Sequence, residues 1–160
     1  MKKTIIVVSG KANIGKTKTI KKVAESILKK YKNDYGNIDI LQQADIKIII
    51  TIEIVVEGTQ IKNTVKVGIS SGGDIANEVQ SNLDYFIKEK CEVIICATRS
   101  KGEPVHLVNR TAEINGYKNI WVAPYYQTQD TKKYLDKRDE LNELSAKHIC
   151  EILDYVLTGA

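Results

Sequence analysis

The sequence is poor in cysteine and lacks any long uninterrupted apolar run. Its three cysteines, Cys91, Cys96 and Cys150, are an odd number at spacings that fit no metal site, so we expect reduced core thiols in a cytoplasmic protein. No apolar run reaches the length of a membrane-spanning helix, and the N-terminal apolar segment predicts a core strand rather than a signal peptide. Internal repeats, linkers and low-complexity segments are also missing. These absences argue against a disulfide-stapled module and a membrane protein.

The remaining composition is ordinary for a globular protein. With 160 residues, 42% hydrophobic and 28% charged, we expect a single domain spanning residues 1–160, large enough for a real core. The formal net charge of +4 comes largely from lysines of the first predicted helix. A solvated helix face explains these lysines, and no aromatic residues are interleaved with them. The sequence therefore does not support a nucleic-acid partner.

The most informative segment is a glycine-rich loop over residues 10–17, with the sequence GKANIGKT. It matches the pattern G-x-x-x-x-G-K-T. An apolar run over residues 4–8 precedes the loop and predicts a buried strand, and apolar residues at helical spacing follow it over residues 19–31. This order of strand, glycine loop and helix makes the pattern specific for phosphate binding.

Each part of this loop suits a bound triphosphate. Gly10 and Gly15 lack a Cβ, so successive backbone N–H groups can point inward at the phosphates. The following helix begins with N–H groups that have no intrahelical partner. Lys16 adds a flexible cation for the β- and γ-phosphates, and the Thr17 hydroxyl is placed to bind Mg²⁺. The alternative, a glycine turn with a chance lysine, is disfavoured by the flanking strand and helix.

Through this loop and its flanks, the chain resembles the P-loop NTPase superfamily and looks like one of its small, stand-alone bacterial members. The resemblance implies that a nucleotide binds together with Mg²⁺, and that Lys16 has a catalytic role. The expected nucleotide contacts in and beside the loop are Gly10, Lys11, Ala12, Asn13, Ile14, Gly15, Lys16, Thr17 and Lys18.

Two features of the loop resemble different branches of that superfamily. Partition-type and nitrogenase-iron-protein-type ATPases have the loop pattern K-G-G-x-G-K-T and carry a second lysine at the position of Lys11. Here Ala12-Asn13 replaces the Gly-Gly of that pattern. That resemblance implies a homodimer in which Lys11 acts catalytically on the phosphates of the partner. Asn13 followed by Gly-Lys-Thr instead resembles the N-x-G-K-[ST] loop of ribosome-assembly-type GTPases. A solvated loop lysine is the alternative interpretation of Lys11.

The rest of the chain alternates between strand and helix patterns. Strict apolar alternation predicts an antiparallel hairpin over about residues 46–57 and 61–70, with a Gly58-Thr59 turn and Ile50 opposite Val67. Further elements are expected as strands over 38–41, 92–97 and 119–123, and as helices over 75–88, 104–115 and 131–157. This order predicts a three-layer α/β fold with a mostly parallel sheet, in which ligands bind at the carboxyl ends of the strands.

The loop after the hairpin, residues 70–74, departs from the pattern of the superfamily. Related NTPases place a metal-holding aspartate directly at this strand end, whereas here Ser70 or Ser71 occupies the position. Asp74 comes later, and two roles are open for it. It is well placed as the N-cap of the next helix, and it is also a candidate catalytic and metal-binding residue beside Thr17. The departure leaves nucleotide turnover open.

Two later loops bear on the identity of the nucleotide. Lys101 stands where GTPases carry a guanine-reading aspartate, so ATP is expected and GTP is less favoured. Arg99 is either a phosphate or substrate contact or a surface arginine. Tyr125 and Tyr126 follow the last strand, where a stack of Tyr125 on adenine and plain packing are both open.

Together these residues predict a nucleoside-triphosphate-binding protein. A Mg²⁺-dependent ATPase or an ATP-driven switch is favoured, and an unknown protein partner is open. A P-loop small-molecule or nucleotide kinase is the alternative, which the scarcity of arginines and the lack of a lid segment disfavour. A nucleotide-binding module with little turnover is the third interpretation, motivated by the missing strand-end aspartate.

Overall fold

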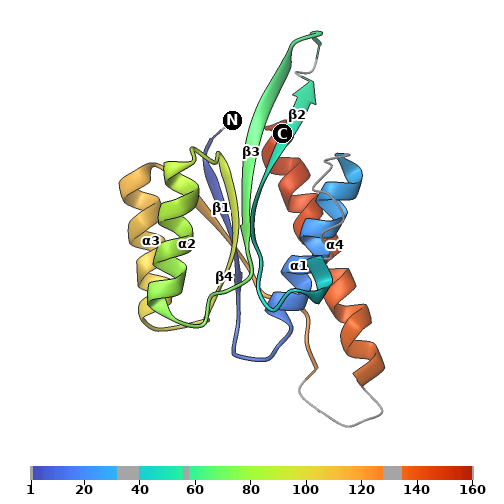
Figure 1. Cartoon of the computed structure of the whole chain (residues 1–160), viewed down its shortest axis with the longest axis vertical. Coiled ribbons are helices and arrows are strands. Elements are labelled where there is room, and N and C mark those ends of the chain that lie inside the picture. Colours follow the sequence, from blue (N-terminus) through green and yellow to red (C-terminus); the bar gives the residue numbers. More distant parts are fainter. Residues whose placement is uncertain (1, 32–39, 56–57, 128–134, 160) are drawn as a thin grey trace.

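The computed structural model describes residues 2–31, 40–55, 58–127 and 135–159 of the chain. Figure 1 shows three layers, in which α1 and α4 cover one face of a β-sheet and α2 and α3 cover the other. In chain order the elements are β1 (Thr4–Ser9), α1 (Lys16–Lys30), the 3₁₀ helix η1 (Ile40–Gln42), β2 (Lys47–Val55), β3 (Lys62–Ser70), α2 (Ala76–Lys88), β4 (Val93–Thr98), α3 (Glu103–Asn115), β5 (Lys118–Val122) and α4 (Leu135–Thr158). None of the helices described combines the length and hydropathy needed to cross a bilayer.

The sheet has the strand order β2-β3-β4-β1-β5. Its strands β3, β4, β1 and β5 are parallel, and only β2 pairs antiparallel with its neighbour. The apolar run of β1 follows from burial on both faces. Ile6 and Val8 belong to the core shared with α1 and α4, whereas Ile5 and Val7 belong to the core shared with α2 and α3. The predicted α/β fold with a mostly parallel sheet is confirmed.

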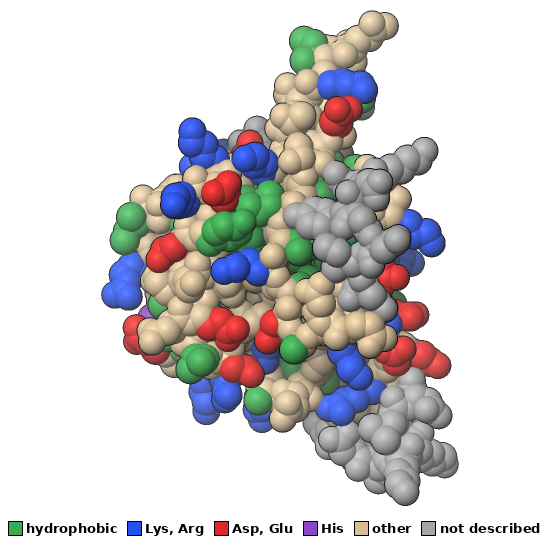
Figure 2. All heavy atoms as spheres, in the orientation of Figure 1, with side chains coloured by type: hydrophobic (Ala, Val, Ile, Leu, Met, Phe, Trp, Pro, Cys, Tyr) green, Lys and Arg blue, Asp and Glu red, His purple; other side chains and the backbone are tan. Residues whose placement is uncertain are grey.

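The antiparallel hairpin of β2 and β3 has the predicted register. Ile50 lies opposite Val67, and Lys47, at the start of β2, lies opposite Ser70, at the end of β3. The predicted turn type and the pairing of Val56 fall partly outside the described residues. The far end of the hairpin projects past the helices, away from the carboxyl ends of the parallel strands (Figure 1). Figure 2 shows hydrophobic side chains near this far end of the hairpin. Val55, the last residue of β2, is exposed.

Two predictions about the elements are wrong. Residues 40–42 form a 3₁₀ helix rather than part of a strand, and residues 38–39 lie outside the described part. In α4 the apolar spacing predicts an inner stripe of Leu141, Leu144, His148, Ile149, Ile152, Leu153 and Val156. Ile149, Leu153 and Val156 are buried as predicted, and the stripe is wrong at Leu144. Leu144, predicted to face inward, is 45% exposed, whereas Asn142 and Ser145 are buried. The physical reason is that these two polar side chains accept hydrogen bonds on the inner side of the helix. Asn142 accepts from Thr19 of α1, and Ser145 accepts from the Tyr125 N–H after β5.

The cysteines occupy apolar surroundings, as predicted. All three are free thiols; Cys91 and Cys96 are buried and Cys150 is half-buried. Burial raises the pKa of Cys96 to about 12 and is the main reason that the pKa of Cys91 rises to about 11. At neutral pH these thiols therefore stay protonated and act as small hydrophobic core groups.

A glycine in β3 makes room for the largest fully buried side chain, Phe86 of α2. A Cβ added at Gly68 would lie 2.4 Å from Cδ1 of the Phe86 ring, which is far inside the normal contact distance. The ring fills the space that this glycine leaves, and it joins Val79 and Leu83 in the core beneath α2.

This contact predicts a coupled pair of substitutions. Gly68→Ala should lower the free energy of unfolding by about 1–3 kcal/mol, because the added methyl overpacks the core. In a Phe86→Leu background the same substitution should cost less, because the smaller side chain leaves room. Urea unfolding of the four proteins of the cycle measures this coupling. An equal cost of Gly68→Ala in both backgrounds would contradict the packing described.

Candidate functional site

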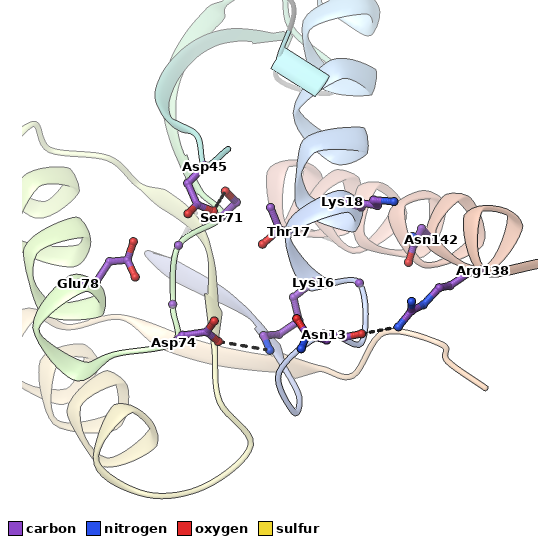
Figure 3. Close-up of a pocket in the computed structure, with 13 residues that line it drawn as sticks. Asn13, Lys16, Thr17, Lys18, Asp45, Ser71, Asp74, Glu78, Arg138 and Asn142 are labelled. Carbon is purple, nitrogen blue, oxygen red and sulfur yellow. Dashed lines mark hydrogen bonds and ion pairs between the residues drawn. The ribbon is translucent and has the colours of Figure 1, made fainter. Parts of the chain in front are cut away.

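Loops at the carboxyl ends of β1 and β3 enclose a cleft of about 400 Å³. This volume lies in the range of about 300–1,000 Å³ that small-molecule sites occupy. Figure 3 shows the cleft between the start of α1 on one side and the β3–α2 loop on the other. Its lining residues are Asn13, Gly15, Lys16, Thr17, Lys18, Asp45, Ser71, Gly72, Gly73, Asp74, Glu78, Arg138 and Asn142.

The glycine-rich loop has the backbone shape of an anion cradle. Asn13 (φ 62°) and Gly15 (φ 97°) are both left-handed, a conformation that turns neighbouring N–H groups toward one concave side. Gly15 is the N-cap of α1 and provides no side-chain cap, and the first turn has no acidic residue. The unpaired N–H groups and the positive end of the helix dipole are therefore available to an anion.

Hydrogen bonds hold the Lys16 side chain against the glycine-rich loop. Its side chain is only 7% exposed, and its Nζ donates hydrogen bonds to the carbonyl oxygens of Gly10 (2.8 Å) and Lys11 (2.6 Å). Burial lowers the pKa of Lys16, the negative charge of Asp74 opposes this effect, and the positive charge of Arg99 adds to it. The ammonium group is thus fixed and largely desolvated beside the cradle.

Asp74 does not cap α2, so this predicted alternative is wrong. The N-cap is Ile75, and no side chain caps the helix. The Asp74 carboxylate instead lies between two cations, with Oδ1 3.9 Å from Lys16 Nζ and 3.7 Å from Arg99 Nε. This attraction accounts for its position. The structure therefore brings together three residues that the sequence placed in separate strand-end loops.

Helix α4 fixes the other side of the glycine-rich loop. Arg138 Nη2 donates a hydrogen bond to the carbonyl oxygen of Asn13 (2.6 Å), and Thr19 Oγ1 donates one to Asn142 Oδ1 (3.4 Å). A Cβ added at Gly15 would lie 2.3 Å from this Asn142 oxygen. Arg138 and Asn142 are four positions apart and so share one helix face. Neither was predicted from the sequence, because hydrophobic spacing does not indicate which polar side chains of a helix face inward.

Two acidic residues of the cleft were also missed. Asp45 precedes β2, and it reaches the cleft because an antiparallel strand begins where its parallel neighbours end. The Ser71 hydroxyl donates a hydrogen bond to Asp45 Oδ1 (2.8 Å). Glu78, in the first turn of α2, lies over Gly72. Burial raises the pKa of Glu78, and the negative charges of Asp45 and Asp74 raise it further. The predicted hairpin register, continued by one residue before its start at residue 46, was the available signal for Asp45.

Lys11 does not line the cleft of its own chain. Together with Gly10 and Ile14, it lines a second hollow on the β5 side of the loop, where Trp121 and Tyr126 also lie. Its contribution to the described site is its carbonyl oxygen, which accepts from Lys16. Ala12 is also not among the residues that line the cleft. The predicted contact of Lys11 with a partner copy stays a prediction.

Tyr125 is not among the residues that line the cleft, and its stack on adenine stays a prediction. Its hydroxyl lies 2.8 Å from His148 Nδ1, the two rings meet edge to face, and its backbone N–H donates to Ser145 Oγ (2.9 Å). These contacts hold the tyrosine against α4. Its neighbour Tyr126 is the aromatic residue that lines the second hollow.

Comparisons with known proteins give no family for this chain. No protein-family model, no curated protein and no solved structure matches it. An α/β fold hosts many unrelated activities, so the function has to be argued from the chemistry of the cleft.

The crowding of acidic residues predicts a pH-dependent gain in stability on Glu78→Gln. The folded protein holds the Glu78 proton more tightly than the unfolded chain does, so ionisation of Glu78 destabilises the fold as the pH rises through the folded-state pKa. Below the unfolded value of about 4.5 this penalty is absent. We expect the variant to unfold at higher urea than the parent at neutral pH, and to match it in acid below that value.

Glu113→Gln, which alters an exposed glutamate of α3 outside the cleft, serves as the matched control. A Glu78→Gln variant that is no more stable than the parent at neutral pH would contradict the electrostatic description of the cleft.

Proposed function

We propose that the chain is a P-loop nucleoside-triphosphate-binding protein that acts as a Mg²⁺-dependent ATPase or ATP-driven switch. The observation that carries the proposal is the glycine-rich loop itself. Its left-handed residues, the uncapped start of α1 and the buried ammonium of Lys16 all meet at one cleft. This combination provides N–H donors, a dipole and a cation for a chain of phosphates.

Further cationic groups line the same side of the cleft. Lys18 and Arg138 accompany Lys16 there. An arriving phosphate would compete with Asp74 for the Lys16 ammonium, which lies 3.9 Å from that carboxylate. Because the ammonium is already largely out of water, its attraction to a phosphate is only weakly screened.

The donor groups of the cleft also fit Mg²⁺. This ion prefers oxygen ligands, keeps several waters, and binds through one or two carboxylates together with the phosphates of a substrate. The Thr17 hydroxyl and the carboxylates of Asp45, Asp74 and Glu78 line one cleft. Within the described part of the chain, no cluster of three His, Cys, Asp or Glu could hold a metal alone. A shared site, completed by nucleotide phosphates and water, is the arrangement that this donor set supports.

Glu78 supports turnover rather than binding alone. The serines at the end of β3 leave no carboxylate directly at that strand end, but Glu78 enters the cleft from the next helix. A carboxylate whose pKa is raised is a better proton acceptor than an ordinary one, so Glu78 is suited to take a proton from an attacking water. Lys101, in place of a guanine-reading aspartate, supports ATP as the nucleotide.

Lys16→Ala tests the proposal directly. Loss of a charge-assisted contact with phosphate should weaken the binding of ATP and of its non-hydrolysable analogue AMP-PNP by about 10-fold or more. Isothermal titration calorimetry measures this affinity. Lys29→Ala is the matched control, because Lys29 is an exposed lysine at the other end of the same helix. The Lys29→Ala variant should bind ATP and AMP-PNP with the affinity of the parent.

Two outcomes would change the proposal. If Lys16→Ala binds nucleotide as tightly as the parent, the site is assigned wrongly. If the parent binds ATP but releases no phosphate above background, the chain is a nucleotide-binding module rather than an ATPase.

A further inference from the structure

The antiparallel pairing of β2 and β3 continues past the end of β3 and into the cleft. The Ser71 N–H donates to the carbonyl oxygen of Ile46 (3.0 Å), and the Ile46 N–H donates to Ser71 Oγ (2.9 Å). Ser71 is buried. These two bonds fix Ile46 against Ser71, and therefore fix the backbone from which the Asp45 side chain leaves.

The Ser71 hydroxyl orients the Asp45 carboxylate. Since this oxygen accepts from the Ile46 N–H, its own hydrogen is directed elsewhere, and it donates to Asp45 Oδ1 at 2.8 Å. One carboxylate oxygen is thereby held. Figure 3 shows Asp45 and Ser71 on the wall of the cleft that faces Thr17, and the Thr17 hydroxyl points into the same space.

The acidic side chains of the cleft differ in whether a cation pairs with them. Asp74 lies within ion-pair distance of both Lys16 and Arg99. Among the ion pairs of the described residues, none involves Asp45 or Glu78. The wall formed by the start of β2 and the start of α2 therefore carries two carboxylates that none of these ion pairs neutralises, opposite the Thr17 hydroxyl, which is a hard oxygen donor.

We propose that Asp45 is the protein carboxylate that holds the Mg²⁺ of the bound nucleotide, together with the Thr17 hydroxyl, and that Ser71 is the positioning residue for Asp45. This inference rests on the proposed nucleotide-binding function. It assigns to the edge strand β2 the role that the sequence had suggested for Asp74. Asp74 is instead neutralised by Lys16 and Arg99, and it serves as their counter-charge.

The assignment also specifies when the metal binds. One carboxylate and one hydroxyl form an incomplete shell for an ion that prefers near-octahedral oxygen coordination. The remaining ligands are phosphate oxygens and water. Metal affinity in the absence of nucleotide should therefore be weak, and it should rise when nucleotide is present.

The test uses Mn²⁺ as a spectroscopic probe in place of Mg²⁺. Electron paramagnetic resonance gives the free Mn²⁺ during titration of the full chain saturated with AMP-PNP. Asp45→Asn keeps an oxygen acceptor for Ser71 but removes the charge, and should lower Mn²⁺ affinity by about 10-fold or more. Metal-free AMP-PNP affinity, measured in EDTA, should be retained. Asp84→Asn on the exposed face of α2, where Asp84 accepts from Gln80, is the matched control.

Asp74→Asn and Ser71→Ala separate the alternatives. Asp74→Asn should retain parental Mn²⁺ affinity, and Ser71→Ala should weaken it less than Asp45→Asn does. Parental Mn²⁺ affinity in Asp45→Asn, or a larger loss in Asp74→Asn, overturns the assignment. If Asp45→Asn is destabilised in urea, Ser71→Ala decides: unchanged Mn²⁺ affinity in that variant overturns the inference. A parent that binds no AMP-PNP even in EDTA instead overturns the proposed function, and this inference with it.

Discussion

Nine residue pairs join β2 to β3, from Lys47 with Ser70 to Val55 with Lys62, and their register determines what stands at the edge of the cleft. Side chains alternate along a strand, so a slip by one residue would turn the buried isoleucines of β2 to the opposite face. Burial of Ile50 and Ile52 therefore holds the register. The same register sets Ile46 against Ser71 and brings Asp45 to the carboxyl ends of strands to which β2 itself runs antiparallel.

The opposite wall depends on a polar face in α4. Asn142 and Arg138 contact the glycine-rich loop from outside, while Ile149 and Leu153 farther along the helix pack in the core with α1. One helix thus joins the core to the loop. The close approach of Asn142 to Gly15 also shows why a residue without a side chain stands there, apart from its positive φ. The shape of the loop is consequently a property of α4 as much as of its own sequence.

Local patterns sufficed for the features that local physics decides. The glycine-rich loop, the hairpin register and the helix end at Gly116 each depend on neighbours within a few residues, and all were predictable. For the cleft, the sequence predicted the glycine-rich loop and Asp74 as site residues. It did not predict Asp45, Glu78 and Arg138, because they come from segments that meet only in the folded chain. In α4 hydrophobic spacing predicted the burial of Ile149, Leu153 and Val156 but not that of Asn142 and Ser145. Those two polar side chains accept hydrogen bonds from Thr19 of α1 and from Tyr125 after β5, and hydrophobic periodicity does not report such contacts.

Burial of Lys16 has a thermodynamic consequence. The fold holds an ammonium group out of water with two backbone carbonyls and a distant carboxylate, so the cost of removing its hydration belongs to folding and not to ligand capture. Binding of an anion beside this ammonium group would therefore offset part of that cost. If the cleft binds the proposed nucleotide, conformational stability and ligand binding are linked through this one side chain, and the free energy of unfolding would rise with ligand concentration.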